Sequence, residues 1–555
     1  MTPTGQSFST SITARCSPST SWVPRSSKCW SAVARKPRWS RKSATNSGSV
    51  PTLSNATFVN SWSASKSTGL SNLAHQTALH ERVREADLST QQQDDRDTYR
   101  LIITRRNGSE LLCLPDGPYH SLPSVDIPRW QRVAEPIRNA VKTNLSLDAY
   151  SLFTCPCETP TSETPRTLFQ AMECVRPDGP IPPTAFWVPI ASLMIDSFRD
   201  AQHFRRICNA LSAPSHDTEP DNESPFAKPG WLRELCNWIA QQIEPMKFRL
   251  TGNFRQLNAS SSFSLMRFET TDAPFWFKAV GKPNTHEFSV VSVLTTLFPA
   301  YLPRMVATRP QWNAWLMREA EGASPDGDSN FSMWKTISAR LGELQIASIQ
   351  ETPRLIAAGC RDLSASSLFN RADEFFAVMA ELMKQQTKTP PSILTSTELL
   401  RLNEQIKDIL SHLAASGIPD ALNHLDFNPG NIFVSGDCCT FIDWAEAAIG
   451  HPFLTFQYMV EHLKRLCPDH ANRREELASG YSSQWEHFAP PSAVSRSLAL
   501  VPLAAVFAHA VATGPWREPE TLASPKAAGY FRSLVRRMKR EADILENRSL
   551  ECTPV

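Results

Sequence analysis

The stretch from Asn423 to Trp444, which reads NHLDFNPGNIFVSGDCCTFIDW, constrains the fold more than any other part of the chain. Two short apolar runs, 432–434 and 440–442, flank Ser-Gly-Asp, which predicts a β-hairpin with a tight turn. A hairpin returns the chain to where it began, so we expect Asp443, at its far end, to lie beside the polar loop at its near end. That loop holds three polar residues in H-x-D-x-x-x-x-N spacing: His424, Asp426 and Asn431.

These residues have the chemistry of phosphoryl transfer. Such a reaction needs a carboxylate that orients an acceptor hydroxyl and takes its proton, and oxygen ligands for the Mg²⁺ that neutralises charge on the phosphates. Asp426 suits the first role, and Asn431 and Asp443 suit the second. The structural alternative is a surface turn between two strands, in which Asp and Asn act only as turn formers.

The full pattern, H-x-D-x-x-P-G-N-I over residues 424–432 and I-D-W over residues 442–444, resembles the signature of the aminoglycoside phosphotransferase family, a broad group of bacterial small-molecule kinases. The resemblance implies an α+β, protein-kinase-like two-lobe fold with a small β-rich N-lobe and a helical C-lobe. It also implies ATP, or GTP, as the phosphoryl donor and a small-molecule hydroxyl as the acceptor. In this reading Asp426 is the catalytic base, and Asn431 and Asp443 bind Mg²⁺.

A strand predicted over 274–280, with the sequence PFWFKAV, places Lys278 inside an apolar run, where an unpaired ammonium group is costly. Glu287, nine residues later in the next predicted helix, is the expected partner. In the family, such a lysine binds the α- and β-phosphates and pairs with a helix glutamate. Lys282 and Glu269 are the rival candidates, and a lysine at a sheet edge with its charge in water is the structural alternative.

Two further segments correspond to nucleotide-binding parts of the family. A loop of small residues between two predicted strands stands where protein kinases place glycines over ATP. Contact with the phosphates must then come from backbone groups or hydroxyls, here those of Ser260, Ser261 and Ser262. The apolar strand that runs into a Glu-Gly turn matches the family's hinge, which binds the adenine edge through backbone groups, here around Met317 and Glu319.

What surrounds the catalytic loop bears on the acceptor. Protein kinases have an Arg before the catalytic Asp and a long activation segment after the metal-binding Asp. Here Leu425 takes the place of that Arg, and a helix is predicted at 453–466, so a small-molecule acceptor is favoured. A polyamine antibiotic would require a cluster of carboxylates, yet acidic residues after Asp443 are matched by basic ones. Several positions depart from the usual family pattern: Leu425, Asn428, Ala445, Glu446, His451 and Thr455.

At 555 residues the chain exceeds a single core, and composition divides it into segments. Residues 1–95 are basic and rich in Ser and Thr, which fits a disordered tail, a wrongly assigned start or, by composition alone, a transit peptide. Residues 96–212 predict a small α+β domain, and 213–229, rich in Pro, Asp and Ser, predicts a linker. The kinase-like lobes are expected at 230–322 and 323–548.

The small domain is predicted as a hairpin turned at Asn107-Gly108, a helix and further strands. This order is faintly similar to that of Nudix domains, but the helix lacks their Glu-rich metal-binding cluster, so a structural or regulatory role is expected. The helix, predicted over 128–147, contains Pro136, which should kink or split it.

Charge and composition narrow the remaining alternatives. The net charge is +2 and no apolar run is expected to reach the length of a membrane span, so neither nucleic acid nor a bilayer is indicated as a partner. The thirteen cysteines lack zinc-ligand spacing and are expected to be buried thiols in a reducing cytoplasm. The sequence therefore predicts a cytoplasmic, ATP- and Mg²⁺-dependent small-molecule O-kinase. A catalytically weak or inactive nucleotide-binding module and a scaffolding protein are the alternatives, and the oligomeric state stays open.

Overall fold

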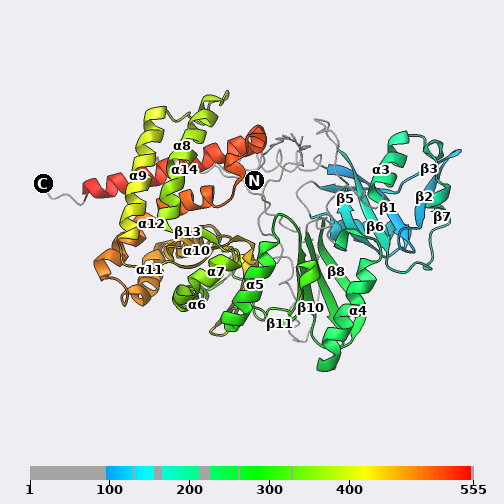
Figure 1. Ribbon diagram of the computed structural model, residues 1–555, viewed down its shortest axis with the longest axis horizontal. Coiled ribbons are helices and arrows are strands. Elements are labelled where there is room, and N and C mark those ends of the chain that lie inside the picture. The colour runs from blue at the N-terminus through cyan, green and yellow to red at the C-terminus, as the bar shows by residue number, and fades with distance from the viewer. Residues whose placement is uncertain are drawn as a thin grey trace, which may run out of the picture. The chain divides into compact units, whose positions relative to one another are not determined.

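The computed structural model describes residues 96–128, 132–155, 166–211, 225–260, 263–326 and 329–551. These residues form two compact units, one built from residues before 212 and the other from residues after 224 in the sequence (Figure 1). The expectations for residues 1–95 lie outside the described residues. Helices and sheets are both abundant, as the sequence predicted.

The N-terminal unit is built on a seven-stranded sheet in the order β3-β2-β1-β6-β5, with β4 paired to β1 and β7 paired to β2. Strands β1 and β6 run parallel, and the other pairs are antiparallel. The strands are β1 (Arg96–Arg105), β2 (Glu110–Asp116), β3 (Tyr119–Ser121), β4 (Ser124–Pro128), β5 (Ala149–Thr154), β6 (Thr167–Cys174) and β7 (Phe186–Pro189).

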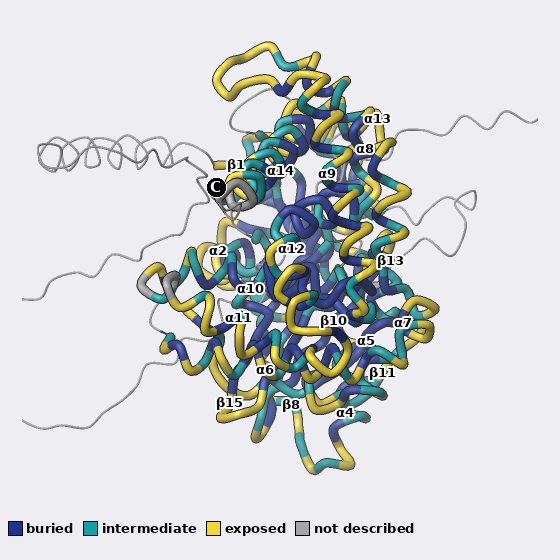
Figure 2. The backbone as a smooth tube through the Cα atoms, turned by 90° about the vertical axis from the view of Figure 1, so that its left-hand side faces the viewer, coloured by how far each residue is buried: buried dark blue, intermediate teal, exposed yellow. Residues whose placement is uncertain are grey.

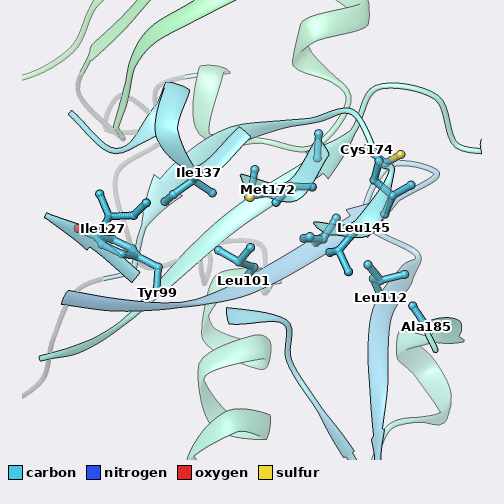
Figure 3. Packing of buried hydrophobic residues seen from close by; sticks show 13 residues of the cluster. Tyr99, Leu101, Leu112, Ile127, Ile137, Leu145, Met172, Cys174 and Ala185 are labelled. Atoms are coloured by element: carbon cyan, nitrogen blue, oxygen red, sulfur yellow. The ribbon is translucent and has the colours of Figure 1, made fainter. Parts of the chain in front are cut away.

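Both faces of this sheet are covered, because successive side chains of a strand point to opposite faces. Leu101 and Ile103 of β1 pack with Ile137 of helix α2 (Ala134–Leu145) in one buried cluster (Figure 3). Ile102 lies in a second cluster with Ile207 of helix α3 (Ala201–Leu211). A continuous apolar run in β1 is therefore what a strand with two buried faces requires.

Two sequence expectations for this unit can be compared with the structure directly. The Asn-Gly turn is present, since Asn107 and Gly108 adopt positive φ angles of 58° and 81° between β1 and β2. The expected kink at Pro136 is wrong. Helix α2 begins at Ala134, so Pro136 lies in its first turn, where a backbone N–H has no helical acceptor to lose. The faint Nudix-like resemblance stays a prediction.

The C-terminal unit begins with helix α4 (Trp231–Ile243) and a five-stranded antiparallel sheet in the order β11-β12-β10-β9-β8. Every residue of the central strand β10 is buried, and Trp231 of α4 packs on its Phe277 at a ring distance of 6.3 Å. Helix α5 (His286–Leu297) connects β10 to β11. The strands are β8 (Leu250–Ser260), β9 (Phe263–Thr270), β10 (Phe275–Val280), β11 (Met305–Arg309) and β12 (Ala314–Arg318).

The rest of this unit is mainly helical and holds two small sheets (Figure 1). One has the order β13-β17-β14, with β13 (Arg361–Leu363), β17 (Ala447–Gly450) and β14 (Ala421–His424), and the other is the hairpin β15 (Ile432–Ser435) and β16 (Cys438–Phe441). The helices are α6 (Phe331–Ser348), α7 (Thr352–Ala358), α8 (Ala365–Lys384), α9 (Ser396–Ala414), α10 (Phe453–Leu466), α11 (Arg474–Ser482), α12 (Pro491–Val511), α13 (Pro519–Leu522) and α14 (Pro525–Glu551).

Helix α12 corrects the expectation that no apolar run in the chain reaches the length of a membrane span. Its 21 residues have the length and hydropathy of a membrane-spanning helix, although Arg496 and Pro502 break the apolar run in the sequence. Within the described part of the chain it is the one helix that meets this criterion. Val501 and Phe507 are nonetheless buried. The helix packs against α10 and α14, and much of it has the colour of buried residues in Figure 2. Its apolar character is thus accounted for by the core of the C-terminal unit.

The segment predicted as a linker, 213–229, is only partly described. Its first residues lie outside the described ranges. Phe226, however, is buried and packs edge-on against Trp231 at a ring distance of 6.3 Å. The end of the segment is therefore part of the C-terminal unit, because an aromatic side chain near the start of α4 anchors it.

Candidate active site

The polar loop between β14 and β15 is a small hydrogen-bonded frame around Asp426. Asn428 donates from Nδ2 to Oδ1 of Asp426 at 2.9 Å, and Asn431 donates from Nδ2 to Oδ2 at 3.1 Å. The side chain of Asn428 also accepts a bond from the backbone N–H of Gly430 at 2.9 Å. Two amide donors thus fix the carboxylate of Asp426 in one orientation.

The amide nitrogen of Asn431 donates to Asp426, whereas its amide oxygen is not used in this frame. Asn431 is only 1% exposed, so this Oδ1 is shielded from water, and it has no hydrogen-bond partner among the described residues. A buried acceptor without a partner costs free energy unless something else binds it. An amide oxygen in this state suits a hard cation such as Mg²⁺, which prefers oxygen ligands.

The hairpin brings Asp443 to the same place, as the sequence predicted. The backbone N–H of Ile442 donates to the carbonyl of Asn431 at 3.0 Å, which closes the hairpin onto the loop. Asp443 then adopts a left-handed conformation with φ 66° and ψ 64°. A non-glycine residue there carries strain of order 1 kcal/mol or more, and such strain is found most often at functional sites.

Asp443 shares its cationic partner with Glu287. Nζ of Lys278 lies 2.5 Å from Oε1 of Glu287 and 2.8 Å from Oδ1 of Asp443, and the side chains of Lys278 and Glu287 are 3% and 2% exposed. The predicted pair is present, and the third member comes from a residue 165 positions away. One buried ammonium group therefore faces two carboxylates.

The charges of this triad are coupled. Burial opposes protonation of Lys278, but Asp443 and Glu287 outweigh it and raise the pKa of the ammonium group above its usual value. Burial raises the pKa of Glu287 to about 7; Lys278 opposes this rise, and the nearby charge of Asp443 adds to it. Lys278 is thus firmly charged.

His424 has a structural position beneath the loop. Its side chain is buried, Nε2 donates to the carbonyl of Ile442 at 2.9 Å, and its backbone N–H donates to Oγ1 of Thr455 at 2.9 Å. Burial lowers the pKa of His424, so the ring is neutral. Thr455 also donates to Asn423 at 2.8 Å. The threonine that departs from the family pattern therefore fixes the start of the loop.

The segments expected to hold the nucleotide base and phosphates are placed in part. Met317 is buried in β12, and the carboxylate of Glu319 accepts bonds from Arg267 at 2.7 Å and from Nε1 of Trp276 at 3.2 Å. A contact from Glu319 to adenine must therefore come from its backbone. Ser260 ends β8, while Ser261 and Ser262 lie outside the described residues.

Of the rival candidates, Glu269 has a different partner from the one proposed for Glu287. Glu269 is paired with Arg267 on its own strand. Asp426, Asn431, Asp443, Lys278 and Glu287 are brought together by the contacts described above. No group of three or more His, Cys, Asp or Glu side chains in the described ranges could hold a metal ion on its own. A metal here would take one carboxylate and one amide from the chain and its other ligands from phosphates and water.

Sequence reasoning missed the clamp between the hinge and the hairpin. Ala323 and Val434 exchange backbone hydrogen bonds of 3.0 Å in both directions. Gly322 precedes this pair with φ 103°, and a Cβ there would lie 2.2 Å from the carbonyl oxygen of Val434. A Gly after Glu in the sequence could have indicated a close approach, but not its partner.

Comparisons with known proteins bear on the family of this unit. Residues 347–491, which contain the catalytic loop and Asp443, match the family model described as "Phosphotransferase enzyme family" (APH). No curated protein sequence matches the chain.

Three solved structures illustrate the structural similarity. A macrolide 2′-phosphotransferase from Brachybacterium faecium is 14% identical, with a TM-score of 0.38, covering 54% of this chain and 97% of that one. An ethanolamine kinase from Plasmodium vivax is 13% identical, with a TM-score of 0.40, covering 63% and 97%. A choline kinase from Streptococcus pneumoniae is 15% identical, with a TM-score of 0.36, covering 57% and 99%. The resemblance inferred from the sequence is confirmed by the family match: residues 347–491 form an APH-family phosphotransferase domain within the C-terminal unit.

Proposed function

We propose that the C-terminal unit transfers the γ-phosphoryl group of ATP or GTP to a hydroxyl group of a small molecule, with Mg²⁺. In this proposal the five-stranded sheet with α5 is the N-lobe and the helical part is the C-lobe of a kinase-like fold. The observation that carries the proposal is the arrangement of Asp426, Asn431 and Asp443 beside buried Lys278. No simpler role accounts for a lysine, two carboxylates and an unpartnered amide oxygen at one buried place.

Each residue has a role that follows from its contacts. Asp426, held by Asn428 and Asn431, orients the acceptor hydroxyl and takes its proton as the new bond forms. Lys278, kept charged by its carboxylate partners, binds the phosphates of the nucleotide. Asn431 and Asp443 would hold Mg²⁺, which would neutralise charge on the phosphates.

The proposal also assigns roles to neighbouring parts of the chain. The backbone around Met317 and Glu319 would bind the base, and Ser260, at the end of β8, would contact the phosphates together with Ser261 and Ser262, which lie outside the described residues. We propose that this activity belongs to the cytoplasm, where the nucleotide donor is available. The N-terminal unit at 96–212 is assigned a structural or regulatory role.

Thermal unfolding with ATP and with GTP, each with and without Mg²⁺, tests the nucleotide part of the proposal. We expect a rise in melting temperature that requires Mg²⁺, because ligand binding to the native state alone stabilises it. Release of nucleoside diphosphate in the presence of an acceptor then tests catalysis. Stabilisation without turnover of any acceptor would instead favour a nucleotide-binding module, and no stabilisation at all would refute the proposal.

A further inference from the structure

A second set of charged residues lies at the same edge of the small sheet as Asp426. In the order β13-β17-β14, His424 of β14 pairs with Ala447 of β17, and Arg361 at the start of β13 pairs with Ala448. The backbone N–H of Leu425 donates to the carbonyl of Glu446 at 3.3 Å, which extends the ladder by one residue. Glu446 and Arg361 therefore stand at the edge from which the catalytic loop leaves.

One nitrogen of the Arg361 guanidinium group is buried without a hydrogen-bond partner in the part of the chain that the structure describes. Its Nη1 is shielded from water and makes no hydrogen bond to any described residue. Burial lowers the pKa of its guanidinium group, and the charge of Glu446 opposes this effect. An unpartnered guanidinium nitrogen away from water is costly, and an anionic group is what would satisfy it best.

Glu446 is the negatively charged counterpart of Arg361 at this edge of the sheet. Burial raises the pKa of its carboxyl group, Arg361 opposes this effect, and the nearby charge of Asp443 adds to it. No ion pair within 4.0 Å joins Glu446 and Arg361 in the described structure, so each feels the charge of the other without neutralising it. A cationic group would stabilise Glu446 in the way an anionic group would stabilise Arg361.

The polar groups on the surrounding helices are used elsewhere. Arg537 of α14 lies 3.5 Å from Glu461 of α10, and Nε2 of His509 is 2.8 Å from the hydroxyl of Tyr530. The hydroxyl of Tyr458 donates to the carbonyl of Ala505 at 2.9 Å. These contacts stabilise the helices around the sheet and leave Arg361 and Glu446 as the two complementary charges beside the catalytic loop.

We propose that Arg361 and Glu446 determine acceptor specificity, and that the acceptor is a small alcohol carrying both an anionic and a cationic group. This inference rests on the phosphotransferase function proposed above. Strands β13 and β14 lie on either side of β17, so Arg361 and the catalytic loop are about 10 Å apart, twice the usual strand spacing. An arginine side chain is long enough to cover most of this backbone separation, so the distance that remains suits a compact acceptor such as a hydroxy-amino acid better than a large antibiotic.

The reaction on such an acceptor is balanced without a further reagent. The hydroxyl oxygen of the acceptor forms a bond to the γ-phosphorus of the nucleotide, and the bond from that phosphorus to the bridging oxygen breaks. The bridging oxygen keeps the electron pair and leaves as nucleoside diphosphate. The hydroxyl proton passes to Asp426, and the ammonium and carboxylate groups of the acceptor are unchanged.

The test uses acceptors that differ by one charged group. L-Homoserine carries both groups, 3-aminopropan-1-ol lacks the carboxylate and 4-hydroxybutyrate lacks the ammonium group; L-serine, ethanolamine and 3-hydroxypropionate form a shorter set. Nucleoside diphosphate release by the full chain with Mg²⁺ and ATP is measured for each. We expect kcat/KM to be roughly 10- to 100-fold higher for a zwitterion than for either relative in its set, the effect of one lost charged hydrogen bond.

Two variants separate recognition from a structural role. Arg361→Met should lower kcat/KM for the zwitterion and the hydroxy acid but not for the amino alcohol, whereas Glu446→Gln should lower it for the zwitterion and the amino alcohol but not for the hydroxy acid. Arg354→Met, at an exposed arginine on α7, is the matched control. A merely structural pair would give equal losses with all three compounds.

Three results would overturn the inference: equal losses, no preference for a zwitterion, or neither turnover nor calorimetric binding of any zwitterion tested. Each of these is meaningful only if Mg²⁺ and ATP stabilise the protein. Failure of that stabilisation would instead refute the proposed phosphotransferase function, so the two failures are distinguishable.

Discussion

At the scale of single residues, the environment of Asp426 allows a clean test of its role. Asp426→Asn keeps the shape of the side chain but offers only one oxygen to the two amide donors, Asn428 and Asn431. We expect nucleotide and Mg²⁺ binding to persist and single-turnover phosphoryl transfer to fall by roughly 10²- to 10⁴-fold, the usual contribution of a positioned acid or base. A wild-type rate at saturating ATP would exclude Asp426 as the base.

Asp443 is the only carboxylate proposed to bind the metal. Asp443→Ala should abolish the Mg²⁺-dependent part of the thermal stabilisation by nucleotide, because the amide oxygen of Asn431 alone is a weak ligand. Asp437→Ala, in the exposed turn of the same hairpin, is the control and should behave as the wild type. Equal Mg²⁺ dependence in both variants would place the metal elsewhere.

His451 should make stability depend on pH. The side chain is 5% exposed, Nε2 has no partner among the described residues, and burial lowers the pKa of its ring from 6.5 to about 3. The unfolded chain therefore binds a proton below pH 6.5 that the folded chain does not bind until about pH 3, so stability is lost as the pH falls through this interval.

The measurement is the free energy of unfolding by denaturant at several pH values for the wild type and for His451→Gln. Near pH 5 the slope against pH should be smaller in the variant by about 1.4 kcal/mol per pH unit, the value for one proton. Carboxyl groups titrate in both proteins, so their effect cancels in the difference. Identical slopes would mean that the ring can be protonated in the folded state.

Residues 423–444 were predictable because their chemistry is local. The loop and the hairpin are close in sequence, so spacing alone placed Asp443 beside Asp426 and Asn431. Glu287 could be predicted as a partner of Lys278 because a buried ammonium group demands a carboxylate nearby. That Asp443 shares the same lysine could not be read from the pattern, since it depends on how the two parts of the unit pack together.

At the scale of elements, the clamp between the hinge and the hairpin should be sensitive to substitution of Gly322. Gly322→Ala places a Cβ 2.2 Å from a backbone oxygen and forces a side chain into φ 103°, a conformation that by itself costs of order 1–3 kcal/mol. The hinge must shift away from β15, so we expect lower thermal stability together with weaker nucleotide binding.

Gly252→Ala is the matched control for this prediction. Gly252 has φ 86°, but a Cβ there would meet nothing within 4 Å. Both variants carry backbone strain, and only the first carries the clash. If the two lose the same stability and both bind nucleotide normally, the close approach of Gly322 to β15 has no role in the site.

Elements were predicted well where they were long and periodic, and poorly where they were short. Helix α10 has the predicted bounds, 453–466, because an apolar stripe recurs along it. The strand β13 has three residues and no periodicity, so nothing in the sequence placed Arg361 beside the catalytic loop. Helix α12 was not predicted, since it is apolar on nearly every side and shows no stripe.

At the scale of the whole molecule, the two units should be separable. Each has its own buried core, and residues 225–551 contain every proposed site residue. We expect a fragment starting at Glu223 to fold and to retain the Mg²⁺-dependent stabilisation by nucleotide that the full chain shows, because it keeps Phe226 packed on Trp231.

A fragment starting at Trp231 is the informative comparison. It lacks Phe226 and should be less stable while binding nucleotide with similar affinity once folded, as measured by calorimetry. If the longer fragment fails to fold or to bind nucleotide while the full chain does both, the N-terminal unit contributes to the nucleotide site and the assignment of a separate role to it is wrong.

The sharing of Lys278 between Glu287 and Asp443 has a consequence for the order in which ligands bind. The ammonium group already satisfies the carboxylate that Mg²⁺ would use, so a metal ion arriving alone competes with a cation that is part of the chain. A nucleotide arriving first offers its phosphates to the lysine and releases Asp443. Binding should therefore be ordered: we expect the free protein to bind Mg²⁺ weakly, and to bind it well only after a nucleotide has bound.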